Sequence, residues 1–310
     1  MRRAITFRRS LPLAALAALA ACAGAAAAPA AAPAPAAAAD AAPAAALAPA
    51  PAAAADATPA AAAAPAAAPA PEFTLSATSV GPRHAYVAGS PVRIAFTIAA
   101  ATALALDVDV VREATGKPVR RFALAAAAPG VAQRITWDAI TGGGAVAPNG
   151  SYRVRVRSAR GTARRLGTLT LRSHVYPIRG AHADRGPIGR FGVGRSGGRT
   201  HEGYDVNAAC GTPLVAARGG RVVRSDYDPV LYGNVVIVRG DHTRRDYWYA
   251  HLQRPSALHV GDHVRTGGRI GRVGATGNAR TVGCHLHFEL HVRSVAVDPA
   301  SELHAWDRWS

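Results

Sequence analysis

The chain has 310 residues, enough for two domains, and its 36 basic and 19 acidic residues give a formal net charge of +17. A balance this basic is typical of proteins that bind nucleic acid, a membrane surface or another polyanion. The export signal at the start of the chain argues against nucleic acid and favours anionic polymers of a cell wall. Part of the charge is also expected on any solvated surface.

Residues 1–22 have the pattern of a secretory signal peptide. Four arginines within the first nine residues precede an apolar run, Leu11–Ala21, that is too short to span a bilayer. The sequence LAAC that ends at Cys22 resembles a bacterial lipobox, which implies a lipid on Cys22 and an anchor on the outer face of the cytoplasmic membrane. Plain secretion is the alternative, and the pair Arg8-Arg9 leaves a twin-arginine export route open.

Residues 23–72 are almost wholly alanine and proline. Side chains large enough to build a core are nearly absent, so a packed domain is excluded here. Frequent proline favours extended conformations, which reach roughly 150 Å at about 3.1 Å per residue. We interpret the segment as a disordered tether that carries the rest of the chain away from a membrane.

Residues 73–173 predict a β-sandwich. The stretches LALDVDVV and SYRVRVR alternate apolar and polar residues, which is the period of a half-buried antiparallel strand. The stretch ITWDAITGGGAVAPNGSYRVRV resembles the Ig-like domain of flagellar hook-capping proteins, which implies a spacer or binding module. About seven short strands are expected. The strand candidates are 73–79, 91–98, 104–111, 118–124, 132–137, 151–157 and 165–171.

Residues 174–310 contain most of the histidines, and the richest stretch is GCHLHFELH at 283–291. As a strand, this stretch would place apolar side chains on one face and three histidines with a carboxylate on the other. Neighbours on one face lie about 6.6 Å apart, which suits one metal ligand beside one assisting histidine. An exposed face that happens to carry histidines is the plain alternative. The core face holds Leu286, Phe288 and Leu290, and the other holds His285, His287, Glu289 and His291.

A catalytic zinc ion needs three protein ligands and an open position, so this strand alone does not complete a site. His201 and Asp205 in THEGYDV are the other candidates, because Gly203 between them lets the backbone bend and bring both onto one ion. The stretch is not the H-E-x-x-H helix motif, and in a strand Glu202 would point away from the site.

His251 ends the stretch DYWYAH, where strand alternation places Tyr247, Tyr249 and His251 on one face. A single histidine after aromatic residues is most simply a structural residue. Together with the other histidines, His251 becomes a candidate catalytic residue, and the two tyrosines would form the floor of a substrate groove.

In chain order, H-x-x-x-D, Y-A-H and G-x-H-L-H-F-E resemble the motifs of the lysostaphin/LytM-type zinc endopeptidases, metallopeptidase family twenty-three. The resemblance runs from about residue 176 to residue 299 and includes CGTPLVAARGGRVV and GDHVRTGGRIGRVGATGNA. It implies an antiparallel β-sheet peptidase domain with one zinc per chain. By this resemblance the metal ligands are His201, Asp205 and His287, and the catalytic pair is His251 and His285.

The chemistry of these residue types agrees with that assignment. Two neutral imidazoles and one carboxylate leave zinc with a net charge of about +1 and room for a water molecule, whose pKa the ion lowers. His285 and His251 can take up a proton or stabilise an oxyanion, and the sequence leaves open which does which. Tyr249, Glu289 and Asn278 are candidates for supporting the ligands or contacting substrate, with plain structural roles as the alternative.

Cys210 and Cys284 are the two cysteines that remain once Cys22 is assigned to the lipid. Outside the cytoplasm such a pair usually forms a disulfide. Strand alternation puts Cys284 on the core side, where it should not reach the metal.

The sequence therefore predicts an all-β, surface-anchored zinc metalloendopeptidase that cuts peptide bonds in peptidoglycan stems or cross-bridges, with stem cross-links favoured over glycine bridges. The alternative is a non-catalytic wall-binding or amidase-activating factor of the same fold, and glycan cleavage by paired carboxylates is a weaker rival. The expected partners are peptidoglycan and anionic wall polymers, with membrane contact through the lipid alone and no nucleic acid.

Overall fold

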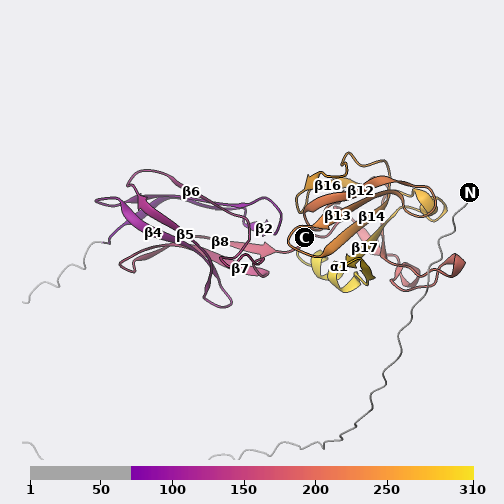
Figure 1. Ribbon diagram of the computed structural model, residues 1–310, viewed down its shortest axis with the longest axis horizontal. Coiled ribbons are helices and arrows are strands. Elements are labelled where there is room, and N and C mark those ends of the chain that lie inside the picture. The colour runs from indigo at the N-terminus through magenta and orange to yellow at the C-terminus, as the bar shows by residue number, and fades with distance from the viewer. Residues whose placement is uncertain (1–70) are drawn as a thin grey trace, which may run out of the picture. The chain divides into compact units, whose positions relative to one another are not determined.

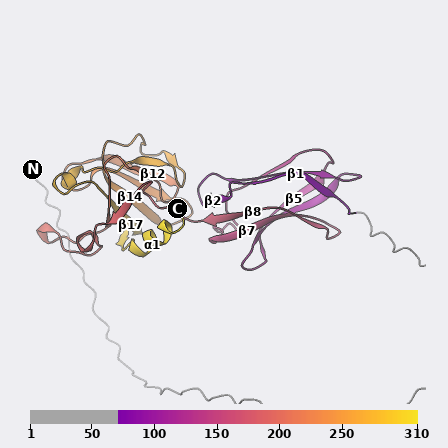
Figure 2. The same cartoon turned by 180° about the vertical axis from the view of Figure 1, so that it is seen from behind.

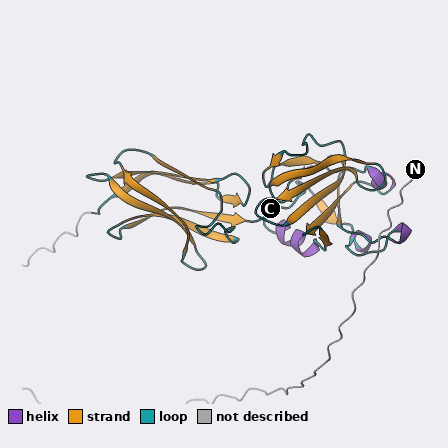
Figure 3. Cartoon of the chain, viewed as in Figure 1, coloured by secondary structure: helices purple, strands orange, loops and turns teal. Residues whose placement is uncertain are grey.

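The structure, a computed structural model, describes residues 71–310 (Figure 1). The predicted signal peptide, the lipid site at Cys22 and nearly all of the predicted tether lie outside these residues. Strands dominate the described part of the chain, as the colours of Figure 3 show. Between residues 71 and 310, no helix is both long and apolar enough to cross a membrane.

Residues 74–172 form two sheets that share one hydrophobic core. Tyr152, Val154 and Val156 are fully buried in this core, whereas the arginines that alternate with them are only half-buried. All seven predicted strands are present, and β2 is an additional one that pairs in parallel with β8. The resemblance to hook-capping Ig-like domains stays a prediction. The first sheet has the order β1(Thr74–Gly81), β3(Val92–Ala99) and β6(Gln133–Trp137), and the second has the order β2(His84–Tyr86), β8(Ala163–Arg172), β7(Gly150–Ser158), β4(Leu104–Arg112) and β5(Pro118–Ala127).

The second region is built on one antiparallel sheet with the order β15-β12-β13-β14-β17-β10-β9, and β18 pairs with β17. Both cartoon views show β14 and β17 side by side (Figures 1 and 2). Its strands are β9(His182–Asp184), β10(Tyr204–Ala208), β12(Gly220–Asp228), β13(Gly233–Gly240), β14(Arg245–Leu252), β15(His263–Val264), β17(His285–Val292) and β18(Val295–Val297). Outside this sheet lie a strand pair, β11(Pro213–Val215) with β16(Arg269–Arg272), the helix α1(Ala300–Asp307), and three short 3-10 turns, Pro187–Gly189, Ser196–Gly198 and Gly277–Thr281.

Strand β17 has the two faces that its sequence predicts. Leu286, Phe288 and Leu290 are fully buried in the core of this region, which also contains Trp306 of α1. Because side chains alternate along a strand, the histidines and Glu289 between them lie on the opposite face of the sheet. The apolar face thus fixes the strand in register, and the polar face is free to build a site.

Candidate metal centre and catalytic histidines

Three ligand-type atoms converge where β10 pairs with β17. Asp205 lies directly opposite His287 in the strand pair, and His201 reaches the same point from the loop before β10. The atoms His201 Nε2, Asp205 Oδ1 and His287 Nδ1 lie 2.9–3.1 Å apart, and all three residues are buried. The ligands of a tetrahedral zinc ion are about 3.3 Å apart when the bonds are about 2.0–2.1 Å, so small adjustments would admit an ion.

The hydrogen bonds of the two imidazoles direct their unprotonated nitrogens toward this point. His201 donates from Nδ1 to the carbonyl oxygen of Arg190 at 2.8 Å, and His287 donates from Nε2 to Glu289 Oε1 at 2.8 Å. With these tautomers, two ring nitrogens and the oxygen of Asp205 face one another as acceptors, so either a proton or a metal cation must lie between them. Such a set calls for a cation, and two imidazoles with one carboxylate suit zinc.

The electrostatics around these atoms also favour positive charge. Burial alone would raise the pKa of Asp205, but its hydrogen bonds with His201 and His287 hold that pKa well below its usual range. Burial lowers the pKa of His287, but its bonds with Asp205 and Glu289 outweigh burial and raise the pKa to about 9. Asp205 and Glu289 are therefore both ionised at neutral pH, and their negative charge attracts a cation to this point.

Glu289 is a buried carboxylate that extends the site along β17. Its Oε1 accepts the bond from His287, and its Oε2 accepts from His291 Nε2 at 2.6 Å. The His291 ring stacks on Trp248 with centroids 4.9 Å apart, and the Tyr232 ring lies 5.9 Å from that of His287. Trp248 and Tyr232 were not among the predicted site residues, although Trp248 could have been found from its alternation with the tyrosines around it. Glu289 has the geometry of a residue that orients a metal ligand.

His251 reaches the site because strand β14 breaks its alternation there. The register between β13 and β14 shifts at this end, and His251 has a left-handed backbone with a φ of +60°. Tyr249 stays on the core face, fully buried and edge-on to Phe288 at 5.5 Å. The prediction that Tyr247, Tyr249 and His251 share one face is therefore wrong. Tyr249 lies in the core and not in the cleft lining, and its hydroxyl accepts a hydrogen bond from the Ala217 N–H.

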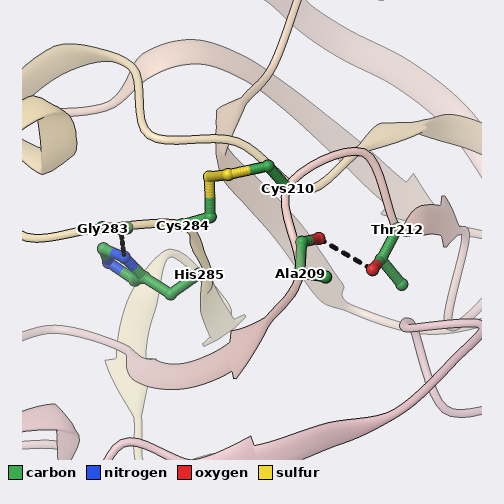
Figure 4. Close-up of a disulfide and its surroundings, with 6 residues drawn as sticks. All are labelled: Ala209, Cys210, Thr212, Gly283, Cys284 and His285. Atoms are coloured by element: carbon green, nitrogen blue, oxygen red, sulfur yellow. Dashed lines mark hydrogen bonds between the residues drawn. A yellow bond between two sulfur atoms is a disulfide. The ribbon is translucent and has the colours of Figure 1, made fainter.

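His251 and His285 form a second pair of imidazoles beside the first, with ring centroids 4.8 Å apart. His251 donates from Nδ1 to the Thr276 carbonyl at 2.9 Å, and His285 donates from Nδ1 to the Gly283 carbonyl at 2.9 Å (Figure 4). Burial lowers the pKa of both rings, to about 3 for His251. Each ring is therefore neutral at neutral pH and has an unprotonated Nε2, which for His285 lies 3.9 Å from Asp205 Oδ1.

A cleft of about 750 Å³ exposes these groups to solvent. Asn278 is exposed and lines the cleft. Glu202 also lines the cleft, although the sequence predicted that its side chain would point away from the site. Alternation does not apply to Glu202, because β10 begins only at residue 204. Gly203 lies in a bend, as predicted, and it also provides room: a Cβ there would lie 2.6 Å from the Phe288 carbonyl oxygen and 2.7 Å from His287 Cε1.

A disulfide links Cys210 and Cys284, whose Cα atoms are 5.3 Å apart (Figure 4). Cys210 follows β10 by two residues, and Cys284 directly precedes His285. Cys284 packs against the core, on the side that alternation predicts. The bond therefore joins the chain segments next to the two strands that carry Asp205 and His287.

Comparison with known proteins relates this region to a family. The profile of Peptidase family M23 matches residues 199–299. The peptidoglycan DD-endopeptidase ShyC of Vibrio cholerae is 39% identical over 101 residues, which are 33% of this chain and 22% of that protein. Lysostaphin of Staphylococcus simulans is 33% identical over 115 residues, 37% of this chain and 22% of that protein. The lipoprotein NlpD/LppB homolog of Pseudomonas aeruginosa is 34% identical over 116 residues, 37% of this chain and 36% of that protein.

Among solved structures, the catalytic domain of lysostaphin from Staphylococcus simulans is 30% identical to this chain, with a TM-score of 0.34. The match covers 37% of this chain and 89% of the lysostaphin domain. The profile match and the sequence relatives together make residues 199–299 similar to Peptidase family M23, with lysostaphin among the similar proteins. The chain spans between 22% and 36% of the length of the curated relatives named above.

Proposed function

We propose that this protein is a zinc metalloendopeptidase that hydrolyses peptide bonds in the stems or cross-bridges of peptidoglycan. The observation that carries the proposal is the convergence of three buried acceptor atoms beside two neutral histidines. The names of the relatives support the substrate class, because they include a peptidoglycan DD-endopeptidase and a glycyl-glycine endopeptidase. Intact ligand types favour the enzyme over a non-catalytic wall-binding or amidase-activating factor.

Each residue of the site has a defined task in this proposal. His201, Asp205 and His287 hold the ion, which when bound lowers the pKa of a water molecule and polarises the scissile carbonyl. His251 and His285 each keep their Nδ1–H on a backbone carbonyl, so each can accept a proton only at Nε2. One ring takes the proton of the attacking water, and a protonated ring can stabilise developing negative charge or protonate the leaving amine.

The cell envelope is the proposed location. Relatives described as lipoproteins support it, as does the lipobox-like sequence at Cys22. We include anionic wall polymers among the partners because the chain has 36 basic and 19 acidic residues, a net charge of +17.

The test is digestion of purified peptidoglycan by the zinc-loaded protein, with the new termini identified by mass spectrometry. The variants His201→Ala and His287→Ala should lose zinc and activity together, whereas His285→Ala should keep zinc and lose turnover. His259→Ala is the matched control, because that side chain is 85% exposed. Equal zinc content in all four variants contradicts the ligand assignment, and a wall without new amino termini contradicts the peptidase.

A further inference from the structure

The segment between β9 and β10 is unusual in its charge. Residues 185–200 contain four arginines and no acidic residue, and this arginine loop leads directly into His201. Three of its arginines, Arg185, Arg195 and Arg199, line the cleft that contains the histidines. From the sequence, the basic charge was predicted to act as a property of the whole chain, and no role was predicted for this loop.

The three arginines differ in how far their guanidinium groups are already engaged. Arg185 donates to Asn207 Oδ1 at 3.0 Å and to the Val282 carbonyl at 2.6 Å, which fixes its position. Arg195 donates to the Ile188 carbonyl at 2.8 Å and lies 3.5 Å from Asp205 Oδ2. Arg199 is exposed and has no side-chain hydrogen bond or ion pair with any residue between 71 and 310. Its charge is available to a ligand.

The cleft also contains three carboxylates, Glu202, Asp205 and Glu289, but among residues 71–310 only Arg195 of the loop lies within ion-pair distance of one of them. Asp205 and Glu289 are both hydrogen-bonded to histidines, which leaves Glu202 as the third carboxylate of the lining. Arg185 is held against the Val282 carbonyl, shortly before His285, and neither it nor Arg199 forms an ion pair with a carboxylate of residues 71–310. The arginine loop therefore presents two guanidinium groups without a carboxylate partner to the cleft, and a bound ion would add positive charge beside them.

We propose that the arginine loop binds a free carboxylate of the substrate, next to the bond that is cut. This inference rests on the proposed function and narrows its substrate class to acidic peptides. Guanidinium groups match carboxylates in charge and in planar, bidentate geometry. A bridge made only of glycine has no side-chain carboxylate, so it leaves these arginines without a partner, whereas stem-peptide cross-links with a carboxylate beside the scissile bond provide one.

The test compares two synthetic cross-linked peptides that differ only in a carboxylate or a carboxamide beside the scissile bond. The zinc-loaded protein should cleave the carboxylate peptide with a kcat/KM about two- to fivefold higher, mostly through KM, as expected for one partly exposed ion pair. Arg199→Gln should reduce this ratio toward one by slowing only the carboxylate peptide, and Arg185→Gln should act in the same direction. Arg254→Gln is the control, because Arg254 lines a separate pocket.

The outcomes separate this inference from the function on which it rests. Equal cleavage of the two peptides by the wild type overturns the carboxylate proposal and leaves the peptidase intact. A preference that persists in both loop variants, with zinc content and melting temperature unchanged, overturns the assignment to the arginine loop. Failure to cut either peptide, or purified wall, removes the proposed function itself.

Discussion

Substitution of Gly203 by alanine should disable the metal centre without touching a ligand. The added Cβ would lie 2.6 Å from the Phe288 carbonyl oxygen and 2.7 Å from His287 Cε1, whereas ordinary contacts begin at 3.4 Å. To restore an ordinary contact, the His287 ring would have to move away from residue 203 by about 0.7 Å and the Phe288 carbonyl of β17 by about 0.8 Å. Neither can move cheaply, because Phe288 is fully buried and the His287 ring is hydrogen-bonded at both nitrogens.

We expect Gly203→Ala to cost about 1–3 kcal/mol of folding stability, the usual range for overpacking. Because His287 must shift, zinc affinity should fall by about 10–100-fold, as when the support of a ligand is lost. Urea unfolding and competition with a chromophoric chelator measure the two effects. Gly194→Ala is the control, since nothing lies within 4 Å of its Cβ position. Wild-type zinc affinity in Gly203→Ala would refute the reasoning.

Three further outcomes follow from the geometry. Glu289→Ala should weaken zinc binding by about 10–100-fold, and Glu289→Gln should weaken it less, because only alanine leaves His287 Nε2 without an acceptor. Equal zinc affinities of the two variants in isothermal titration would contradict this. Replacing Cys210 and Cys284 together by alanine should lower the free energy of unfolding by a few kcal/mol, because the disulfide restrains a separation of 74 residues in the unfolded chain. Thiol titration of the unreduced, denatured wild type should find no free thiol between residues 71 and 310. Burial lowers the pKa of His174 from 6.5 to about 3, so below pH 6.5 the unfolded chain takes up a proton that the folded chain does not. His174 alone should therefore remove about 2 kcal/mol of stability between neutral pH and pH 5. In pH-dependent denaturation His174→Gln should lose about 2 kcal/mol less than the wild type, while the loss due to His251 remains.

Strand β17 could be predicted from the sequence because its alternation is unbroken and one face is wholly apolar. The pairing of Asp205 with His287 followed from residue chemistry and from resemblance, not from periodicity. The face of His251 could not be predicted from the alternation of side chains along a strand, because the bulge in β14 leaves no signal in the side-chain pattern. The same error placed Tyr249 in the cleft.

Some parts of the site carry no residue-type signal at all. The acceptors that orient His201, His251 and His285 are backbone carbonyls, and any residue could supply them. Which carbonyl lies beside which ring depends on the fold of loops far apart in the chain. The arginine loop is different, because its composition is visible in the sequence and only its position over the cleft needed the structure.

The left-handed backbone of His251 sets activity against stability at a single residue. A non-glycine residue in this conformation costs about 1 kcal/mol or more, although histidine tolerates it better than most, as do asparagine and aspartate. Asparagine would fit the same backbone and could leave the fold at least as stable, yet it would remove the imidazole. If His251 and His285 act as proposed, selection for thermal robustness alone would erode this pair, and a stabilised, inactive descendant would differ from its parent by one residue.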